Sequence, residues 1–160
     1  MSIVLLSLAL SSSLADEARE RAEILDVLDV FFSAMTEKNA VAMQEVMTVD
    51  GVLYGYRDGE NGPEMFSITH ADYLENLSNN EGLPVERIWD PKVDLHDRIA
   101  IVWTPYDFHN EGVFSHCGMN TFSMRKDNDG WKIIGVVFSV QTDNCDESPL
   151  GPLPATGRAE

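Results

Sequence analysis

His116 is the residue of this chain best suited to proton transfer, because an imidazole exchanges a proton near neutral pH and a pocket can tune that exchange. It lies in a segment, 114–124, whose side chains alternate in character with the period of a β-strand. A strand histidine can instead be structural, held by a hydrogen bond to Tyr106 or Gln141. The predicted register brings no carboxylate to His116, which argues against an isomerase or dehydratase, since those enzymes aim an Asp or a His/Asp pair into the cavity.

The turns between the predicted strands decide which residues pair, because a slip of one residue exchanges the two faces of a sheet. We expect a two-residue reversal at 97–98, a three-residue loop at 110–112 and a turn at 127–130. In this register one face collects the six residues that we predict to bind a ligand: Trp89, Tyr106, His116, Asn120, Ser139 and Gln141. Apolar side chains surround them, among them Val102 and Phe122, and such a mixture is typical of small-molecule pockets.

The other predicted site residues also have two interpretations. Asn120 could donate a hydrogen bond to a ligand carbonyl, or it could satisfy a buried position of the sheet. Trp89 and Tyr106 could stack on a flat ring or belong to the core. The histidines and cysteines lack the spacing of a metal site, and the sequence has neither a Gly-rich phosphate loop nor a nucleophile elbow. We therefore expect no metal and no cofactor.

The elements that must position these residues are helices first and strands afterwards. Apolar residues at helical spacing predict an amphipathic helix over 16–38, and shorter helices follow over 40–47 and 69–77. Strands are predicted over 52–57, 85–95 and 99–109, and in the hairpin 114–140. Pro91 and Pro105 fall inside predicted strands, where a bulge must bend the sheet. This order is typical of an α+β cone, in which N-terminal helices pack on a curved antiparallel sheet.

The composition indicates one domain with a strongly acidic surface. A chain of 160 residues is the size of one ordinary domain. Its 27 acidic and 11 basic side chains give a formal charge of -16, which repels phosphate backbones and anionic lipids. We therefore expect no binding to nucleic acid or membrane surfaces, whereas neutral or cationic small ligands are favoured.

The N-terminal segment 1–15 combines an apolar run with the small-residue site Ser13-Leu14-Ala15, which is typical of a secretory signal peptide. We expect its removal on secretion or export to the periplasm, and a cytoplasmic protein with a packed N-terminus is the alternative. The domain then spans 16–142, and a Pro/Gly-rich tail spans 143–160. Cys117 and Cys145 could form a disulfide in an oxidising compartment, and two buried free thiols are equally compatible with the sequence.

Four segments of the chain carry a resemblance to a known family. These are Glu86-Arg87-Ile88-Trp89-Asp90-Pro91-Lys92-Val93 and the segments 100–108, 114–122 and 130–133. They resemble the nuclear transport factor 2-like superfamily over 16–141, and within it the exported, SnoaL-like bacterial branch that is labelled lumazine-binding. The resemblance implies the α+β cone. It leaves the activity open, because the superfamily contains steroid isomerases, scytalone dehydratase and polyketide cyclases as well as binding and transport proteins.

The opposite face of the predicted sheet is largely apolar. It carries Ile101, Trp103, Met119, Thr121, Ile134, Val136, Phe138 and Val140. Such a face cannot all be left to water, so we predict a homodimer formed through it.

The sequence thus supports three functions. The first is an exported protein whose cone-shaped pocket binds a small apolar or heteroaromatic molecule without an assigned reaction. The second is an isomerase, dehydratase or cyclase that uses His116 as acid and base. The third is a dimeric interaction module whose cavity is filled by side chains such as Phe31, Phe32 or Met35.

Overall fold

The structure of the protein is a computed structural model that describes residues 3–79 and 81–153, with side chains from residue 14 onward. Three helices, α1 (Ile3–Glu37), α2 (Ala40–Val46) and α3 (His70–Leu77), accompany seven strands. The strands are β1 (Met47–Gly59), β2 (Gly62–Thr69), β3 (Pro84–Ile88), β4 (Lys92–His96), β5 (Ile99–Asn110), β6 (Val113–Asp127) and β7 (Gly130–Val140). They form one sheet in the order β2-β1-β7-β6-β5-β3, with β4 also paired to β5.

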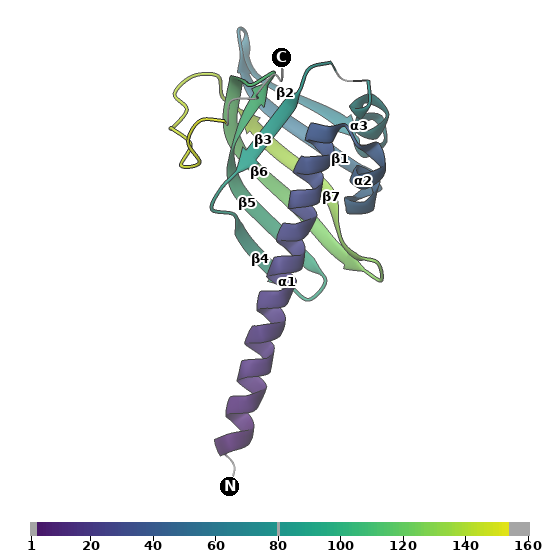
Figure 1. Ribbon diagram of the computed structural model, residues 1–160, viewed down its shortest axis with the longest axis vertical. Coiled ribbons are helices and arrows are strands. Elements are labelled where there is room, and N and C mark those ends of the chain that lie inside the picture. Colours follow the sequence, from purple (N-terminus) through teal and green to yellow (C-terminus); the bar gives the residue numbers. More distant parts are fainter. Residues whose placement is uncertain (1–2, 80, 154–160) are drawn as a thin grey trace, which may run out of the picture.

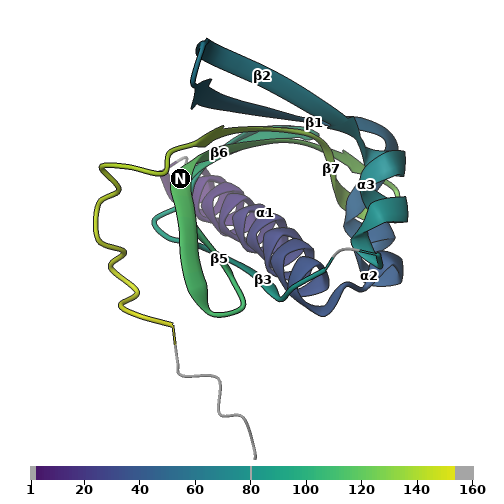
Figure 2. The ribbon, with the colours of Figure 1, turned by 90° about the horizontal axis from the view of Figure 1, so that it is seen from above.

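The sheet curls around α1, as Figure 2 shows, and this confirms the α+β cone predicted from the sequence. The sheet is mixed rather than wholly antiparallel, because β1 pairs with β7 in parallel. Phe31 and Phe32 of α1 meet Phe122 of β6 edge to face, with ring centroids 5.6 and 5.9 Å from it. This aromatic contact lies in the core between the helix and the concave face of the sheet.

Among the residues whose side chains the structure describes, Glu20 makes the first hydrogen bonds of α1 with the sheet. Its carboxylate accepts hydrogen bonds from Lys126 Nζ (2.6 Å) and Trp131 Nε1 (2.8 Å) at the far end of the β6–β7 hairpin. Residues 14–19 are exposed, and Figure 1 shows the first turns of α1 projecting from the domain. The helix therefore begins earlier than the predicted 16–38, and it ends where predicted, at Lys38, whose φ of 56° is left-handed.

Both short helices begin at a capping residue. Asn39 Oδ1 accepts from the Ala42 amide (3.1 Å) at the start of α2. Thr69 Oγ1 accepts from the Asp72 amide (3.1 Å) and donates to its carboxylate (2.7 Å) at the start of α3. The strand β2 was not predicted, because its Gly62-Pro63 start has the composition of a loop.

The predicted strand over 85–95 is divided into β3 and β4 by a kink. Asp90 has a left-handed φ of 46°, and an extra residue in this segment shifts the pairing with β5 by one. Val93 pairs with Val102 as predicted, but Ile88, rather than Trp89, pairs with Tyr106. A shift of one residue exchanges the faces of a strand, so β3 presents its even-numbered residues to the concave side.

A second irregularity shifts β7 against β6. The pairing changes between Ser123 and Met124, so Asn120 faces Phe138 rather than Val137. As a result, Phe138 and Val136 lie on the concave face, while Ser139 lies on the outer face and Gln141 continues that side of the sheet. The β5–β6 loop also differs from the prediction, because Asn110 pairs with Val113 across a two-residue turn and His116 pairs with Phe108.

The segment after β7 folds back onto the sheet. Cys117 and Cys145 form a disulfide, with their Cα atoms 5.9 Å apart. Arg87 donates to the Gly151 carbonyl oxygen (2.9 Å) and pairs with the buried carboxylate of Asp107. None of the helices that the structure describes is long and apolar enough to cross a membrane.

We predict that Leu28→Ala destabilises the protein by about 2–5 kcal/mol, because Leu28 is 0 % exposed between α1 and the sheet. Val30→Ala is the matched control on the same helix, since Val30 is 39 % exposed, and it should change the free energy of unfolding by less than about 1 kcal/mol. Urea denaturation measures both variants. Equal effects would contradict the packing of α1 on the concave face.

Candidate functional site

A central cavity of about 210 Å³ lies between α1, α3 and the concave face of the sheet. Twelve side chains line it: Phe31, Met35, Leu53, Tyr73, Glu86, Tyr106, Phe108, His116, Asn120, Phe122, Val136 and Phe138. Most of them are apolar or aromatic, and the few polar groups can fix the orientation of a ligand. The cavity exists because α1 covers the concave face without filling it, although Phe31 and Met35 form part of its wall.

The strongest polar contact in the cavity joins a carboxyl group and an amide. Asn120 Nδ2 donates to Glu86 Oε1 at 2.6 Å, and Asn120 itself is buried. Glu86 faces this side because of the kink at Asp90, which turns the even-numbered residues of β3 inward. The pair places a hydrogen-bonded carboxyl group in an otherwise apolar chamber.

The environment of Glu86 holds its carboxyl near the point of half-protonation at neutral pH. Burial raises the pKa of Glu86 from 4.5 to about 7, the hydrogen bond from Asn120 acts in the opposite direction, and the charge of Asp107 adds to the rise. Such a group can accept or donate a proton near pH 7.

His116 occupies the wall next to β5. Its ring stacks on Phe108, with centroids 4.8 Å apart, and meets Tyr106 edge to face at 5.7 Å. The Ser115 hydroxyl lies 3.0 Å from Nδ1. Burial lowers the pKa of His116, so the imidazole is neutral at pH 7. Within the described residues no carboxylate forms a hydrogen bond or an ion pair with His116, which leaves it without the acidic partner of a catalytic pair.

Tyr106 forms a wall of the cavity, where a hydrogen bond holds it and the glycine opposite leaves room for its ring. Its hydroxyl donates to the Ser139 carbonyl oxygen (2.8 Å). A Cβ atom at Gly118 would lie 1.9 Å from that oxygen and 2.8 Å from the Tyr106 ring, so only glycine fits there. Burial raises the pKa of Tyr106, which keeps the phenol neutral.

The structure brings together half of the predicted site residues. Tyr106, His116 and Asn120 line the central cavity, which agrees with the predicted face. Their roles in binding remain predictions. The placement of Ser139 and Gln141 on this face was wrong because of the shift between β6 and β7. The placement of Trp89 was wrong because of the kink at Asp90, and Trp89 does not line the cavity.

Sequence reasoning missed the carboxyl group of the cavity. Glu86 lies in a predicted strand, but the predicted register put it on the outer face. The signal that could have found it is Asp90-Pro91, since a residue before proline is restricted and a kink there would shift the register by one. Tyr73 was missed as well, because nothing in the sequence says which side of α3 faces the sheet opening.

Comparisons with known proteins identify the fold. A nuclear transport factor 2-like superfamily protein from Salmonella enterica serovar Typhimurium is 15% identical with a TM-score of 0.61, covering 90% of this chain and 98% of that chain. An NTF2-like protein from Cytophaga hutchinsonii is 12% identical with a TM-score of 0.63, covering 76% and 98%. A protein of the NTF2-like family from Streptomyces avermitilis, described as a candidate dehydratase, is 16% identical with a TM-score of 0.59, covering 75% and 94%.

The chain therefore has the NTF2-like fold that its sequence resembles. No family model and no curated protein matches the sequence. At these identities the structural matches define the fold alone, and the function must be argued from the site.

We predict that Glu86 titrates with a midpoint near pH 7, which ¹³C NMR of the glutamate carboxyl groups can follow. Asn120→Ala should move the midpoint higher, because it removes the hydrogen bond that favours the carboxylate. The folded-state pKa lies above the unfolded value, so this group's contribution to stability falls as the pH rises from about 4.5 to 7.

Glu86→Gln supplies the control for both measurements. The resonance that titrates near pH 7 should be absent from this variant, and its stability should fall less between pH 5 and 8 than that of the unmodified protein. A Glu86 midpoint below pH 5 would contradict the buried position of the carboxyl.

Proposed function

We propose that the protein binds a small, flat, largely apolar or heteroaromatic molecule in the central cavity. The observation that carries this proposal is the Glu86–Asn120 pair at the wall of an apolar chamber of about 210 Å³. A dry cavity of about 150 Å³ is enough for benzene, so this chamber suits a molecule of one or two rings. The resemblance to the branch labelled lumazine-binding favours a heteroaromatic ring.

The chemistry of the walls defines the ligand further. Phe31 and Phe138 offer aromatic contact to a ring, while the carboxyl–amide pair can exchange hydrogen bonds with a polar edge. His116 is neutral, and Glu86 is either neutral or negatively charged. Neither side chain can therefore neutralise the charge of an anionic ligand. The formal charge of -16 also repels anions, so the proposed ligand is neutral or cationic.

A second candidate function is proton transfer on the bound molecule, as in an isomerase, dehydratase or cyclase. One observation favours Glu86 over His116 as the acid and base. The Glu86 side chain lines both the central cavity and an open groove formed by Phe32, Ser33, Thr36 and Glu37, so it lies between the ligand site and solvent. A carboxyl with a pKa of about 7 in that position can take a proton from a ligand and release it outside.

Export is part of the proposal, with removal of residues 1–15. Two observations support it: residues 14–19 of α1 are exposed, and Cys117 and Cys145 form a disulfide, which suits an oxidising compartment. Loss of the segment before Asp16 would leave the contacts of Glu20 with Lys126 and Trp131 intact.

We predict that 2-naphthol, a two-ring probe with one hydroxyl, binds in the cavity and changes fluorescence in titrations. Glu86→Met should weaken its binding about tenfold, because one hydrogen bond worth about 1.4 kcal/mol is lost while the volume is kept. Glu60→Gln, an exposed glutamate of the β1–β2 turn, is the control and should bind as the unmodified protein does. Absence of 2-naphthol binding would contradict the proposal, and native mass spectrometry of the freshly purified protein would show what it carries instead.

We also propose a homodimer through the outer sheet face, here defined as Tyr54, Tyr56, Ile101, Trp103 and Val137. These five side chains are between 42 % and 53 % exposed. Trp103, Thr121, Val137 and Tyr54 form one row across four paired strands, so the patch is contiguous. The predicted face is corrected at three positions of β7, because Val136, Phe138 and Val140 point to the concave side.

We predict that the protein sediments as a dimer at micromolar concentration and that Trp103→Glu gives a soluble monomer, because a charge would be buried in the interface. Val41→Glu is the matched control, since Val41 is exposed on α2 and away from the sheet face, and it should remain dimeric. A monomeric unmodified protein would contradict the dimer.

A further inference from the structure

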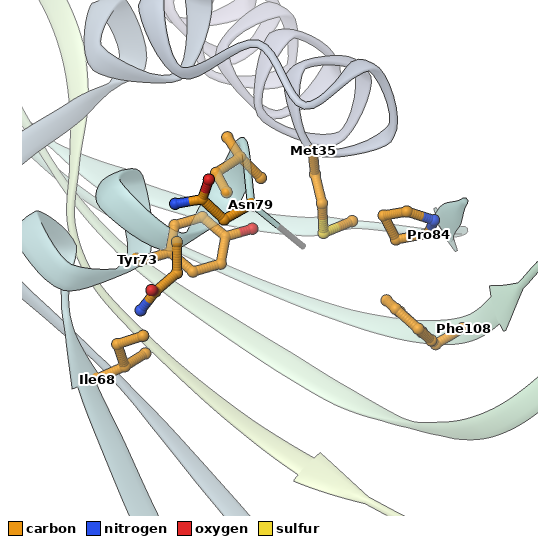
Figure 3. A pocket seen from close by; sticks show the side chains of 8 residues that line it. Met35, Ile68, Tyr73, Asn79, Pro84 and Phe108 are labelled. Carbon is orange, nitrogen blue, oxygen red and sulfur yellow. The ribbon is translucent and has the colours of Figure 1, made fainter. Parts of the chain in front are cut away.

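A second, outer chamber of about 450 Å³ adjoins the central cavity. Eight residues line it: Met35, Ile68, Tyr73, Asn76, Leu77, Asn79, Pro84 and Phe108. Their side chains are drawn in Figure 3, where α1, α3 and the strands face a common space. The proposed function does not use this chamber.

Three side chains separate the two chambers. Met35 of α1, Tyr73 of α3 and Phe108 of β5 line both the central cavity and the outer chamber, and Figure 3 shows them projecting into the same space. Met35 is unbranched and rotates about three bonds, which lets it adapt to a molecule that passes beside it. Rotation of the Met35 side chain is therefore the change that would join the two chambers.

None of the described residues that line the outer chamber is charged. Ile68, Leu77 and Pro84 supply apolar surface. Asn76 supplies an amide from the last turn of α3, and Asn79 supplies a second amide from the turn that follows this helix. Asn79 Nδ2 donates to the Glu75 carbonyl oxygen (3.2 Å), which leaves its amide oxygen as an acceptor. The Asn76 side chain makes no hydrogen bond within the described part of the chain, so it has donors and an acceptor to offer.

We infer that the ligand has two parts: a ring system in the central cavity and an uncharged chain that crosses the Met35–Tyr73–Phe108 partition and ends in an amide, hydroxyl or carbonyl group beside Asn76 and Asn79. The inference rests on the proposed function and names the class of molecule that the site takes. The amides can hydrogen-bond a neutral polar group, whereas a charged end group would find no opposite charge in the lining.

The test compares three probes that share one ring. The first is 2-naphthol, the second is 4-(6-hydroxynaphthalen-2-yl)butanamide, and the third is the corresponding butanoic acid, which is anionic at pH 7. We expect the amide to bind about tenfold more tightly than 2-naphthol, because the chain adds apolar contact and a hydrogen bond. The butanoic acid should bind no more tightly than 2-naphthol.

Variants of the protein then show where the butanamide chain of the probe binds. The double variant Asn76→Ala/Asn79→Ala should bind 2-naphthol unchanged and lose most of the gain of the amide probe. Both positions are exposed, Asn76 in α3, where alanine is a good helix former, and Asn79 in the turn after it. Asn61→Ala, in the β1–β2 turn, is the matched control and should keep the gain.

The outcomes separate the inference from the proposed function. If 2-naphthol binds and the amide probe gains nothing, or if the double variant keeps the gain, the two-part ligand is overturned while ring binding in the central cavity stands. If neither probe binds, the proposed function fails together with the inference.

Discussion

The site depends on how α1 lies in the concave face of the sheet. Phe31 and Phe32 pack edge to face on Phe122, and the Glu20 contacts with Lys126 and Trp131 fix the helix about three turns nearer its N-terminus. The helix therefore excludes water from the middle of the cone while its last turns border two chambers. A helix shifted along its axis would fill the cavity with Phe31 or Met35 and leave the polar groups without access.

The carboxyl group of Glu86 in the cavity lowers the stability of the fold. Moving a carboxyl group out of water is unfavourable, and one hydrogen bond from Asn120 compensates only part of that loss, as the raised pKa of Glu86 shows. An apolar residue of similar volume would stabilise the core more. A buried acid with incomplete compensation, facing an open chamber, is the kind of group that functional sites contain.

Sequence patterns predicted most of the elements. Helical spacing and the turn at Asp97 located helices and strands, whereas β2 was missed and α1 begins at Ile3 rather than at residue 16. The resemblance to the NTF2-like superfamily gave the cone itself, which the structural matches support. These signals are local, so they can be read without knowledge of the tertiary contacts.

The candidate site was predicted only in part, because its membership depends on register. Tyr106, His116 and Asn120 were placed on the right face because the predicted β5–β6 pairing was shifted by two residues, which preserves the face. Trp89, Ser139 and Gln141 were misplaced by shifts of one residue, and the same kind of shift concealed Glu86. Pro91 predicted a bulge, but the predicted pairing did not include the shift of one residue that it produces in β3, and no proline marks the shift between Ser123 and Met124.

The kink at Asp90 turns Glu86 toward Asn120 inside the cone, and the candidate site depends on this orientation. A NOESY spectrum of the uniformly labelled protein reports on it, because the two side chains belong to strands that are not neighbours in the sheet. The structure predicts cross-peaks between the Asn120 side-chain amide protons and the γ protons of Glu86. Cross-peaks from that amide to Arg87 or Trp89 instead would show that β3 presents its other face, and they would contradict the account.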